Sequence, residues 1–413
     1  MIQKVLVIGL VWPEPSSSAA GTRMLQLLQF FLNEGASVRF ASAAQQTEFS
    51  FPLTSIGVET YEIQLNDSGF DDFVRGQNPD VVLFDRYTTE EQFGWRVAEA
   101  VPNALRILDT EDLHCLRAAR EAAVKNEVDF KPEDLLRSPT ALREVAAIYR
   151  SDLSLMISQA EIRFLVDVFG VPDDLLWYLP FLYEPLSDAS IAEWPSFHTR
   201  NNYFFIGNFR HYPNYDALRY LKTVIWPRIR TFDTEAILYV YGAYISPPVQ
   251  QLHDPGLGFH IRGRAESVKT VMQEARVLLA PLRIGAGHKG KLAEAMQFGL
   301  PSVTTSIGAE GMTADGRWGG CITDDPDLFA KYAVDLYHDQ ELWQRKQQEG
   351  IDVFRSLDPD ATKETFRKRL ANLQIHLSDS RMRNFIGKML THHTMSSYKY
   401  LSRWIEEKAK RNP

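Results

Sequence analysis

Cysteine is scarce in this sequence of 413 residues, where Cys115 and Cys321 are the only two. They lie far apart and lack the spacing of metal ligands, which excludes a disulfide framework and a cysteine-based metal centre. Free thiols in a reducing cytoplasm are therefore the expectation. The sequence also lacks any apolar run near the roughly 18 residues that a membrane span requires.

The sequence also has no excess of positively charged residues. The 45 Lys and Arg residues are outnumbered by 53 Asp and Glu residues, which gives a formal net charge of −8. Broad, sequence-independent binding to nucleic acid is not expected from such a chain, although a local cationic pocket is compatible with it. The length predicts two domains rather than one.

The N-terminus imitates a signal peptide, because Lys4 precedes the apolar residues 5–12. This apolar part is only eight residues long, and Pro13 and Pro15 end it. A first buried strand explains the segment better than a cleaved leader does.

Short apolar runs alternate with helical patterns along most of the chain, which is typical of α/β domains with parallel sheets. The runs expected to form buried strands are 5–8, 37–41, 81–84, 105–108, 153–157, 203–206, 237–241, 259–262, 277–280, 302–305 and 321–323. Prolines and small polar residues interrupt this alternation over 184–200, which predicts a linker. We expect one α/β domain over 1–183, a second over 201–378 and a separate helix over 379–413.

The segment 283–296 combines glycines, cations and one carboxylate directly after a predicted strand. Its glycines are Gly285, Gly287 and Gly290, and its cations include Arg283, Lys289 and Lys291. Exposed backbone amides, a helix N-terminus and positive charge predict a phosphate site at this strand-to-helix turn. Glu294, one turn into the helix, suits the diol of a ribose. The lysines do not have P-loop spacing, and a glycine-rich turn with solvent-exposed lysines is the alternative.

Charged residues also follow two predicted strands of the first half. The segment Leu108–His114 holds three carboxylates and a histidine, which suggests acid/base work. Capping of the next helix by Asp109 or Thr110 is the alternative. We do not expect a metal there, since no second cluster completes a ligand set. Asp85 and Arg86 follow another predicted strand, and we expect them to contact the acceptor, which is the substrate that receives a transferred group.

The segment 281–312, with KLAEAM, GLPSVTT and GAEGM, resembles the donor-binding region of the group 1 glycosyltransferases. This is glycosyltransferase family 4, which is retaining and has the GT-B fold. The resemblance extends more loosely over the C-terminal half, through FIGNFR at 205–210. It implies two Rossmann-like domains with parallel sheets that face across a cleft, and a C-terminal helix that returns to the first domain. It also implies a nucleoside-diphosphate sugar as donor substrate, with no metal or other cofactor.

The resemblance assigns roles to particular residues. The donor-binding set is Gly21, Arg210, Arg283, Gly287, Lys289, Lys291 and Glu294. Glu294 matches the family glutamate that holds the donor ribose, and His114 matches a histidine near the transferred sugar. Gly21, together with Arg23, is expected to face the donor diphosphate.

Two positions depart from the family pattern. Ala286 stands where the family often has a second glutamate, and Asn208 stands where it often has an arginine, for which Arg210 is the candidate substitute. The predicted function is transfer of a sugar to a glycan, lipid or other acceptor, and the resemblance implies retention of configuration. A nucleotide-sugar 2-epimerase and a non-catalytic nucleotide-sugar-binding module are the alternatives.

The last helical stretch, 379–410, is basic and has an apolar side. The resemblance predicts that it crosses back to the first domain. Contact with a membrane surface is a second and compatible hypothesis, since its lysines and arginines would meet anionic lipid. We therefore expect a cytoplasmic protein with peripheral contact to the inner face of a membrane.

Overall fold

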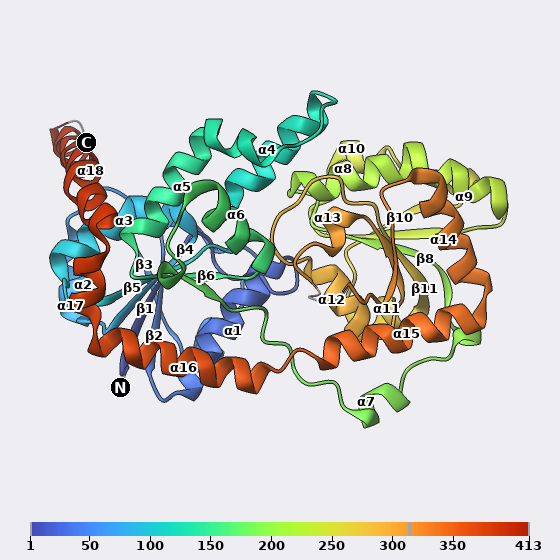
Figure 1. Ribbon diagram of the computed structural model, residues 1–413, viewed down its shortest axis with the longest axis horizontal. Coiled ribbons are helices and arrows are strands. Elements are labelled where there is room, and N and C mark those ends of the chain that lie inside the picture. The colour runs from blue at the N-terminus through green and yellow to red at the C-terminus, as the bar shows by residue number, and fades with distance from the viewer. Residues whose placement is uncertain (1, 313–315, 412–413) are drawn as a thin grey trace. The chain divides into compact units, whose positions relative to one another are not determined.

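The computed structural model describes residues 2–312 and 316–411 (Figure 1). The chain divides into two compact units, which are described separately. Unit 1 comprises Met1–Cys115, Lys131–Leu182 and Asp360–Pro413. Unit 2 comprises Leu116–Phe130 and Tyr183–Pro359.

Unit 1 is built on a parallel sheet, which has the order β3-β2-β1-β4-β5-β6-β7 in the described residues. Its strands are β1 Lys4–Gly9, β2 Ser37–Ser42, β3 Glu59–Glu62, β4 Val81–Asp85, β5 Leu105–Asp109, β6 Leu153–Met156 and β7 Leu176–Tyr178. The α-helices that begin in this unit are α1 Ala19–Asn33, α2 Gly69–Gln77, α3 Arg86–Ala100, α4 His114–Lys125, α5 Pro139–Arg150, α6 Gln159–Phe169, α17 Leu377–Arg383 and α18 Phe385–Arg411. Helix α16 Pro359–Ile375 begins at the boundary and continues in unit 1.

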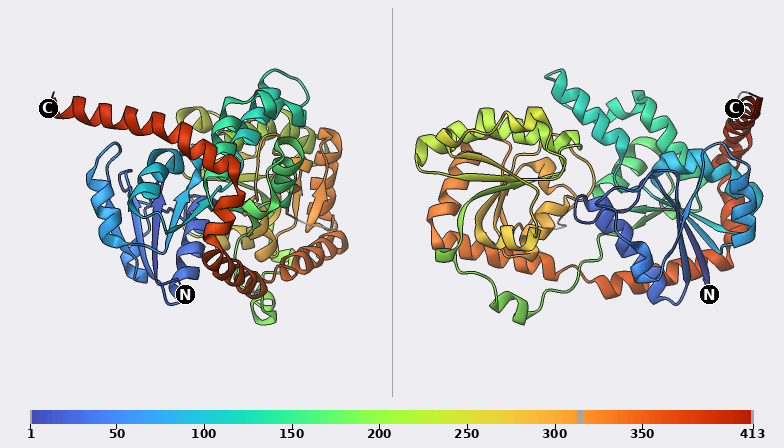
Figure 2. Two further views of the ribbon diagram at one scale, coloured as in Figure 1. Left: turned by 60° about the vertical axis from the view of Figure 1, so that its left-hand side comes forward. Right: turned by 180° about the vertical axis from the view of Figure 1, so that it is seen from behind.

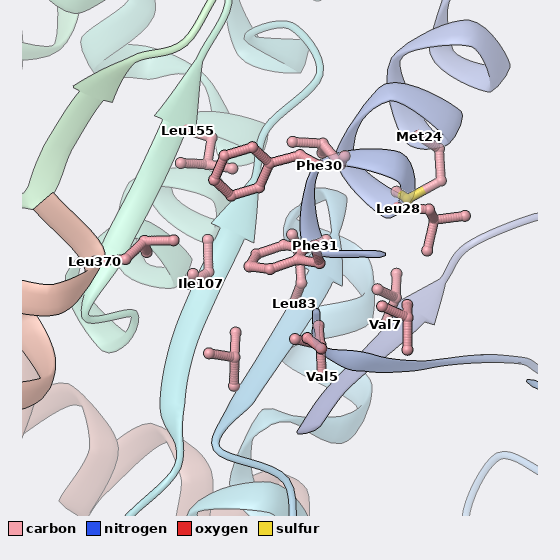
Figure 3. Packing of buried hydrophobic residues seen from close by; sticks show 14 of the residues in the cluster. Val5, Val7, Met24, Leu28, Phe30, Phe31, Leu83, Ile107, Leu155 and Leu370 are labelled. Atoms are coloured by element: carbon pink, nitrogen blue, oxygen red, sulfur yellow. The ribbon is translucent and has the colours of Figure 1, made fainter. Parts of the chain in front are cut away.

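One buried cluster joins distant parts of unit 1 (Figure 3). Phe30 and Phe31 of α1 are almost fully buried, beside strand residues such as Leu83 and Ile107. The ring of Phe366 in α16 lies 5.0 Å from that of Phe30. The C-terminal segment is thus part of the core of unit 1.

Unit 2 has a second parallel sheet, of order β10-β9-β8-β11-β12-β13 in the described residues. Its strands are β8 Asn201–Ile206, β9 Leu238–Tyr241, β10 Phe259–Gly263, β11 Ala275–Ala280, β12 Ser302–Thr304 and β13 Gly320–Ile322. Its α-helices include α7 Asp188–Ala192, α8 Tyr212–Tyr220, α9 Trp226–Phe232, α10 Pro247–Gln250, α11 Val268–Glu274, α12 Gly290–Gln297, α13 Ser306–Ala309, α14 Pro326–His338 and α15 Gln340–Arg355. Large buried side chains such as Tyr203, Trp226 and Phe259 fill its core.

Each sheet contains a point at which the order of its strands reverses. In unit 1 this point lies between β1 and β4, and in unit 2 it lies between β8 and β11. The loops that leave the carboxyl ends of two such strands turn to opposite faces of the sheet. Ligands of open α/β sheets bind in the crevice that remains between those loops.

The predicted α/β architecture is confirmed, and every predicted buried run forms a strand within about two residues of its expected bounds. Strands β3 and β7 were not predicted. Both lie at the edges of their sheet, where β3 is polar and β7 has only three residues, so neither shows a long apolar run. The expected linker region contains the short helix α7.

Candidate functional site

The glycine-rich loop leaves β11 at the strand-order reversal of unit 2 and ends where α12 begins at Gly290. Gly287 has a φ of +63°, a conformation that glycine adopts without strain. Helix α12 buries Leu292, Ala295 and Met296. Its Lys291 and Glu294 stay half-buried on another side of the helix.

Lys291 connects the two loops that flank this crevice. Its Nζ donates a hydrogen bond to Oδ1 of Asn214 at 2.6 Å, and Nδ2 of Asn214 donates to the backbone carbonyl of Asn208 at 2.9 Å. Asn208 follows β8, whereas Lys291 follows β11. The ammonium group is therefore fixed at the strand-order reversal, where a ligand is expected.

Burial shifts the pKa values of both charged groups on α12 toward neutrality. It lowers the pKa of Lys291 to about 7, although the negative charge of Glu294 acts against this shift. It raises the pKa of Glu294 to about 7, against the effect of Lys291. Burial and the charge of Glu294 also raise the pKa of Tyr183 well above its usual value. An anion beside Lys291 would favour the charged ammonium.

The other predicted cations of unit 2 differ in their surroundings. Arg283 forms two hydrogen bonds to the buried carboxylate of Asp216, at 2.6 and 3.1 Å, so its charge is balanced within the unit. Nζ of Lys289 donates to the carbonyl of Gly287 at 2.7 Å and thus closes the glycine-rich loop on itself. Arg210 is exposed and stacks on Tyr244, with its guanidinium carbon 3.6 Å from the ring centroid.

An arginine from a distant part of the sequence binds the glycine-rich loop. Nη1 of Arg120 donates to the carbonyl of Gly285 at 2.7 Å. The guanidinium also makes two 2.7 Å hydrogen bonds to the carboxylate of Glu310. Arg120 is buried, so these bonds are little weakened by solvent. Arg120 could not be found from the sequence pattern, whereas Glu310 lies in the segment 281–312 that resembles the family.

In unit 1, Gly21 and Arg23 occupy the first turns of α1. The amide of Gly21 donates to Oγ of the helix cap Ser18 at 3.1 Å, and a Cβ at position 21 would come within 2.4 Å of the backbone of Glu14. Arg23 is fully buried and pairs with Asp109 at 3.2 Å. The expectation that Arg23 faces a diphosphate is therefore wrong, because its charge is used inside unit 1.

His114 is the first residue of α4, and its Nε2 lies 3.5 Å from Oδ1 of Asp112. The alternative that Asp109 or Thr110 caps this helix is wrong, since Asp109 pairs with Arg23 and Thr110 donates to the carbonyl of Leu155 at 2.9 Å. The two carboxylate oxygens of Glu144 accept the amides of His114 and Cys115, each at 2.9 Å. Burial raises the pKa of Glu144 to about 7.

Asp85 is the last residue of β4, and Arg86 follows it in a left-handed conformation with φ +68°. Oδ2 of Asp85 accepts the amide of Leu10 at 2.9 Å, which joins the ends of β1 and β4 across the strand-order reversal. Nε of Arg86 lies 3.5 Å from Oδ1 of Asp85. Both predicted acceptor residues thus lie at the crevice of unit 1.

The described residues contain neither a cluster of metal ligands nor a helix that could span a membrane. No group of three or more His, Cys, Asp or Glu side chains in residues 2–312 and 316–411 is arranged to hold a metal ion. No helix in that part of the chain has both the length and the apolar run that crossing a membrane demands.

Part of unit 2 resembles a known protein family. Residues 200–339 match the family model described as "Glycosyl transferases group 1". No curated protein sequence matches the chain.

Solved structures resemble nearly the whole chain. HepE of Anabaena in complex with UDP superposes with a TM-score of 0.64 at 12% identity, covering 90% of this chain and 100% of that one. Sucrose-phosphate synthase from Thermosynechococcus elongatus gives a TM-score of 0.64 at 14% identity, with 90% and 99% covered. A UDP-forming α,α-trehalose-phosphate synthase from Burkholderia xenovorans gives 0.60 at 11% identity, with 90% and 99% covered. The likeness shows the predicted GT-B fold of two Rossmann-like domains, and the family match confirms the predicted glycosyltransferase domain.

Proposed function

We propose that this glycosyltransferase takes a sugar from a nucleoside-diphosphate sugar and holds the nucleotide at the strand-order reversal of unit 2. The observation that carries this assignment is the chain of hydrogen bonds from Lys291 through Asn214 to Asn208. It fixes a lysine of lowered pKa at the crevice where ligands bind in such sheets. Glu294, on the same helix, supplies a carboxylate for the ribose hydroxyls.

The residues of the glycine-rich loop have separate roles in this proposal. Lys291, Lys289 and the backbone amides near Gly287 bind the diphosphate, with Arg283 and Arg210 at the border of the site. Positive charge and amide dipoles stabilise the negative charge that develops on the leaving nucleoside diphosphate. These groups would supply the stabilisation that a metal ion provides in other phosphate sites, so we propose a reaction that needs no metal.

Unit 1 contributes the remaining residues of the proposed reaction. His114 would act on the transferred sugar, Gly21 would approach the diphosphate, and Asp85 and Arg86 would contact the acceptor. The family resemblance of residues 281–312 favours retention of configuration at the anomeric carbon.

The proposal is tested by incubating the protein with UDP-, GDP- and ADP-sugars and measuring the release of free nucleotide. Slow donor hydrolysis by the wild type, abolished in Glu294→Ala and unchanged by EDTA, is the expected result. Proton NMR of the released sugar would show whether the anomer that forms first has the same anomeric configuration as the donor. An epimerised nucleotide-sugar would instead indicate an isomerase, and tight donor binding without any turnover would indicate a binding module.

A second part of the proposal is contact with a membrane surface through α18, which lies on the outside of unit 1 (Figures 1 and 2). One side of this helix packs on α3 and α5. Ser402 accepts a hydrogen bond from Arg96 there at 3.1 Å, and Lys399 forms an ion pair with Glu99. The opposite side exposes large apolar residues.

The exposed stripe contains Phe385, Met389, Tyr400 and Trp404, which are 46–71% exposed. Spacings of 4, 11 and 4 residues keep them on one side of the helix. The helix also carries Lys388, Lys399, Arg403, Lys408, Lys410 and Arg411 against only Glu406 and Glu407. A second copy of the chain would bring like charges together, whereas an anionic lipid surface accepts both the aromatic rings and the cations.

Sedimentation with lipid vesicles tests this surface. The wild type should bind vesicles that contain phosphatidylglycerol and should bind pure phosphatidylcholine far less. Trp404→Ser combined with Phe385→Ser should reduce binding about tenfold or more, because each ring buries apolar area. Phe232→Ser, at an exposed phenylalanine of unit 2, is the matched control. Equal binding to both lipids, or equal loss in the control, would contradict the proposal.

A further inference from the structure

A buried tyrosine binds a side chain of the glycine-rich loop. Tyr183 begins the segment Tyr183–Pro359 of unit 2, and its Oη shares a hydrogen bond of 3.3 Å with Nε2 of His288. The two residues are 8% and 9% exposed, and their ring centroids lie 5.8 Å apart. The imidazole of this loop residue is therefore held by a side chain that lies 105 residues earlier in the sequence.

The core of unit 2 fixes the position of Tyr183. Its ring lies 5.4 Å from that of Phe354, a buried residue of helix α15. Burial and the negative charge of Glu294 raise the pKa of Tyr183 well above its usual value of about 10, so the hydroxyl keeps its proton at neutral pH. A protonated hydroxyl can donate to an imidazole nitrogen. Tyr183 is thus a fixed hydrogen-bonding partner for the loop.

Two cations hold the peptide groups that precede His288. Arg120 binds the carbonyl of Gly285, and Nζ of Lys289 binds the carbonyl of Gly287, each at 2.7 Å. In a trans peptide the N–H group points opposite to the carbonyl group. The amide that follows each of these carbonyls therefore points away from the cation that binds it. The conformation of the loop thus decides where its amides point.

The glycines make this loop costly to hold in one conformation. Gly285, Gly287 and Gly290 lack the side chains that would restrict their backbone, and Gly287 has a φ of +63°. Such residues lose more conformational entropy than others when they become ordered. A buried contact at His288 orders the loop before a ligand arrives, so less of the binding free energy is lost on binding.

We propose that Tyr183 is a positioning residue of the donor site, which acts through His288 to hold the glycine-rich loop in the conformation that binds a diphosphate. The inference rests on the proposed function, in which the amides of this loop bind the diphosphate of the donor. Tyr183 does not itself contact the nucleotide. Its effect therefore appears in the binding of the diphosphate and is absent from the binding of the nucleoside.

Calorimetry with UDP, GDP and ADP, and ligand-observed NMR with uridine, guanosine and adenosine, test this role in Tyr183→Phe. The substitution removes one hydroxyl group and keeps the ring that packs on Phe354. We expect the diphosphate to bind about fivefold more weakly, because a buried hydrogen bond is lost, and its nucleoside to bind as in the wild type. Unchanged affinity for the diphosphate would overturn the inference. An equal loss for the nucleoside would also overturn it, since it would indicate a general structural role.

Two further variants locate the effect. His288→Leu should weaken diphosphate binding by a similar factor, and Tyr183→Phe should add little in that background, because the two residues form one contact. Multiplicative losses would contradict this coupling. Tyr203→Phe is the matched control, since the hydroxyl of Tyr203 is buried in unit 2 and has no hydrogen-bond partner among the described residues. A loss in this control equal to that in Tyr183→Phe would overturn the assignment.

Limited trypsin digestion of the free protein separates this inference from the proposed function. Lys289 is 8% exposed, so cleavage after it requires the loop to open. Tyr183→Phe should be cleaved there about fivefold faster than the wild type, and Tyr203→Phe at the wild-type rate. Faster cleavage of Tyr183→Phe, with no nucleotide bound by the wild type, would refute the donor assignment and leave the hold of Tyr183 on the loop in place. Nucleotide binding by the wild type, with cleavage and affinity unchanged in Tyr183→Phe, would refute this inference alone.

Discussion

Each unit forms a crevice at the equivalent place in its own sheet, but the side chains at the two crevices differ in charge. In both sheets the strand order reverses once, and the loops beside that reversal carry the candidate residues. In unit 1 the strand ends themselves are acidic, at Asp85 and Asp109. In unit 2 strand β11 ends at Ala280, and the loop beyond it supplies glycines and cations.

This difference shows which part of the architecture decides the ligand. Topology places a crevice, whereas the residues at the strand ends and in the following loop set its charge. Carboxyl oxygens suit hydroxyl groups, and lysine with bare backbone amides suits phosphate. Substitutions in either crevice, and changes of pH, should test this contrast, with effects that range from several kcal/mol to about threefold in affinity.

The buried pair of Arg23 and Asp109 should dominate the stability of unit 1. Arg23→Ala leaves a carboxylate buried without its partner, which should lower the free energy of unfolding by about 3–5 kcal/mol. Urea denaturation followed by circular dichroism measures this change. Weakened nucleotide binding at unchanged stability would instead return Arg23 to a role at the diphosphate.

Reversing the charge at the crevice of unit 2 should abolish its preference for anions. Lys291→Glu is expected to weaken nucleotide binding at least about 100-fold, since it replaces a charge-assisted bond by repulsion. Lys269→Glu makes the same change at an exposed position of α11 and serves as the control. Similar losses in both variants would mean that general electrostatics, rather than this site, governs binding.

The first turn of helix α1 should tolerate no side chain at position 21. Gly21→Ala would bring a Cβ within 2.4–2.6 Å of backbone atoms of Glu14, so we expect destabilisation by about 1–3 kcal/mol. Gly76→Ala in α2 meets no atom within 4 Å and should be neutral or slightly stabilising. Thermal unfolding of both variants measures the difference, and equal melting temperatures would contradict the geometry at Gly21.

Loss of the hydrogen bonds from Arg120 to Gly285 and Glu310 should have a smaller effect on nucleotide binding. Arg120→Lys retains the charge but cannot bind Gly285 and both oxygens of Glu310 together, so nucleotide binding should weaken about threefold to tenfold. Glu310→Gln should give a similar loss, and the double variant should lose less than the product of the two. Independent, multiplicative losses would show that the two residues do not act together.

The pH dependence of donor binding should be the mildest effect. Binding requires an ionised Glu294, which is lost below its pKa of about 7, and a charged Lys291, which is lost above its pKa of about 7. Affinity for a nucleotide-sugar should thus be highest near pH 7 and about threefold lower at pH 6 and pH 8. Lys291→Arg should remove the alkaline decrease only, and a flat wild-type profile would contradict the shifted pKa values.

Much of the fold could be predicted because buried parallel strands are continuous apolar runs. Residues 81–84 and 277–280 are examples in which the local pattern alone is sufficient. Strand β3, Glu59–Glu62, escaped prediction because an edge strand does not require such a run. The glycine-rich loop was also predictable, since its chemistry lies within one short segment.

The partners of the candidate residues could not be predicted, because they depend on tertiary contacts. Asn214 lies 77 residues before Lys291, and Arg120 lies 165 residues before Gly285. The same limit explains the wrong role of Arg23, whose partner Asp109 is 86 residues away. Shifted pKa values escaped prediction too, because the burial of a charged side chain depends on tertiary contacts.

The most direct test of the donor site is calorimetric titration of the wild-type protein and Glu294→Ala with UDP, GDP and ADP. We predict that the wild type binds at least one of these nucleotides and that Glu294→Ala, which cannot bind the ribose hydroxyls, binds it at least about tenfold more weakly. Absence of binding to all three, or equal affinity in the variant, would contradict the assignment of the nucleotide to the crevice of unit 2.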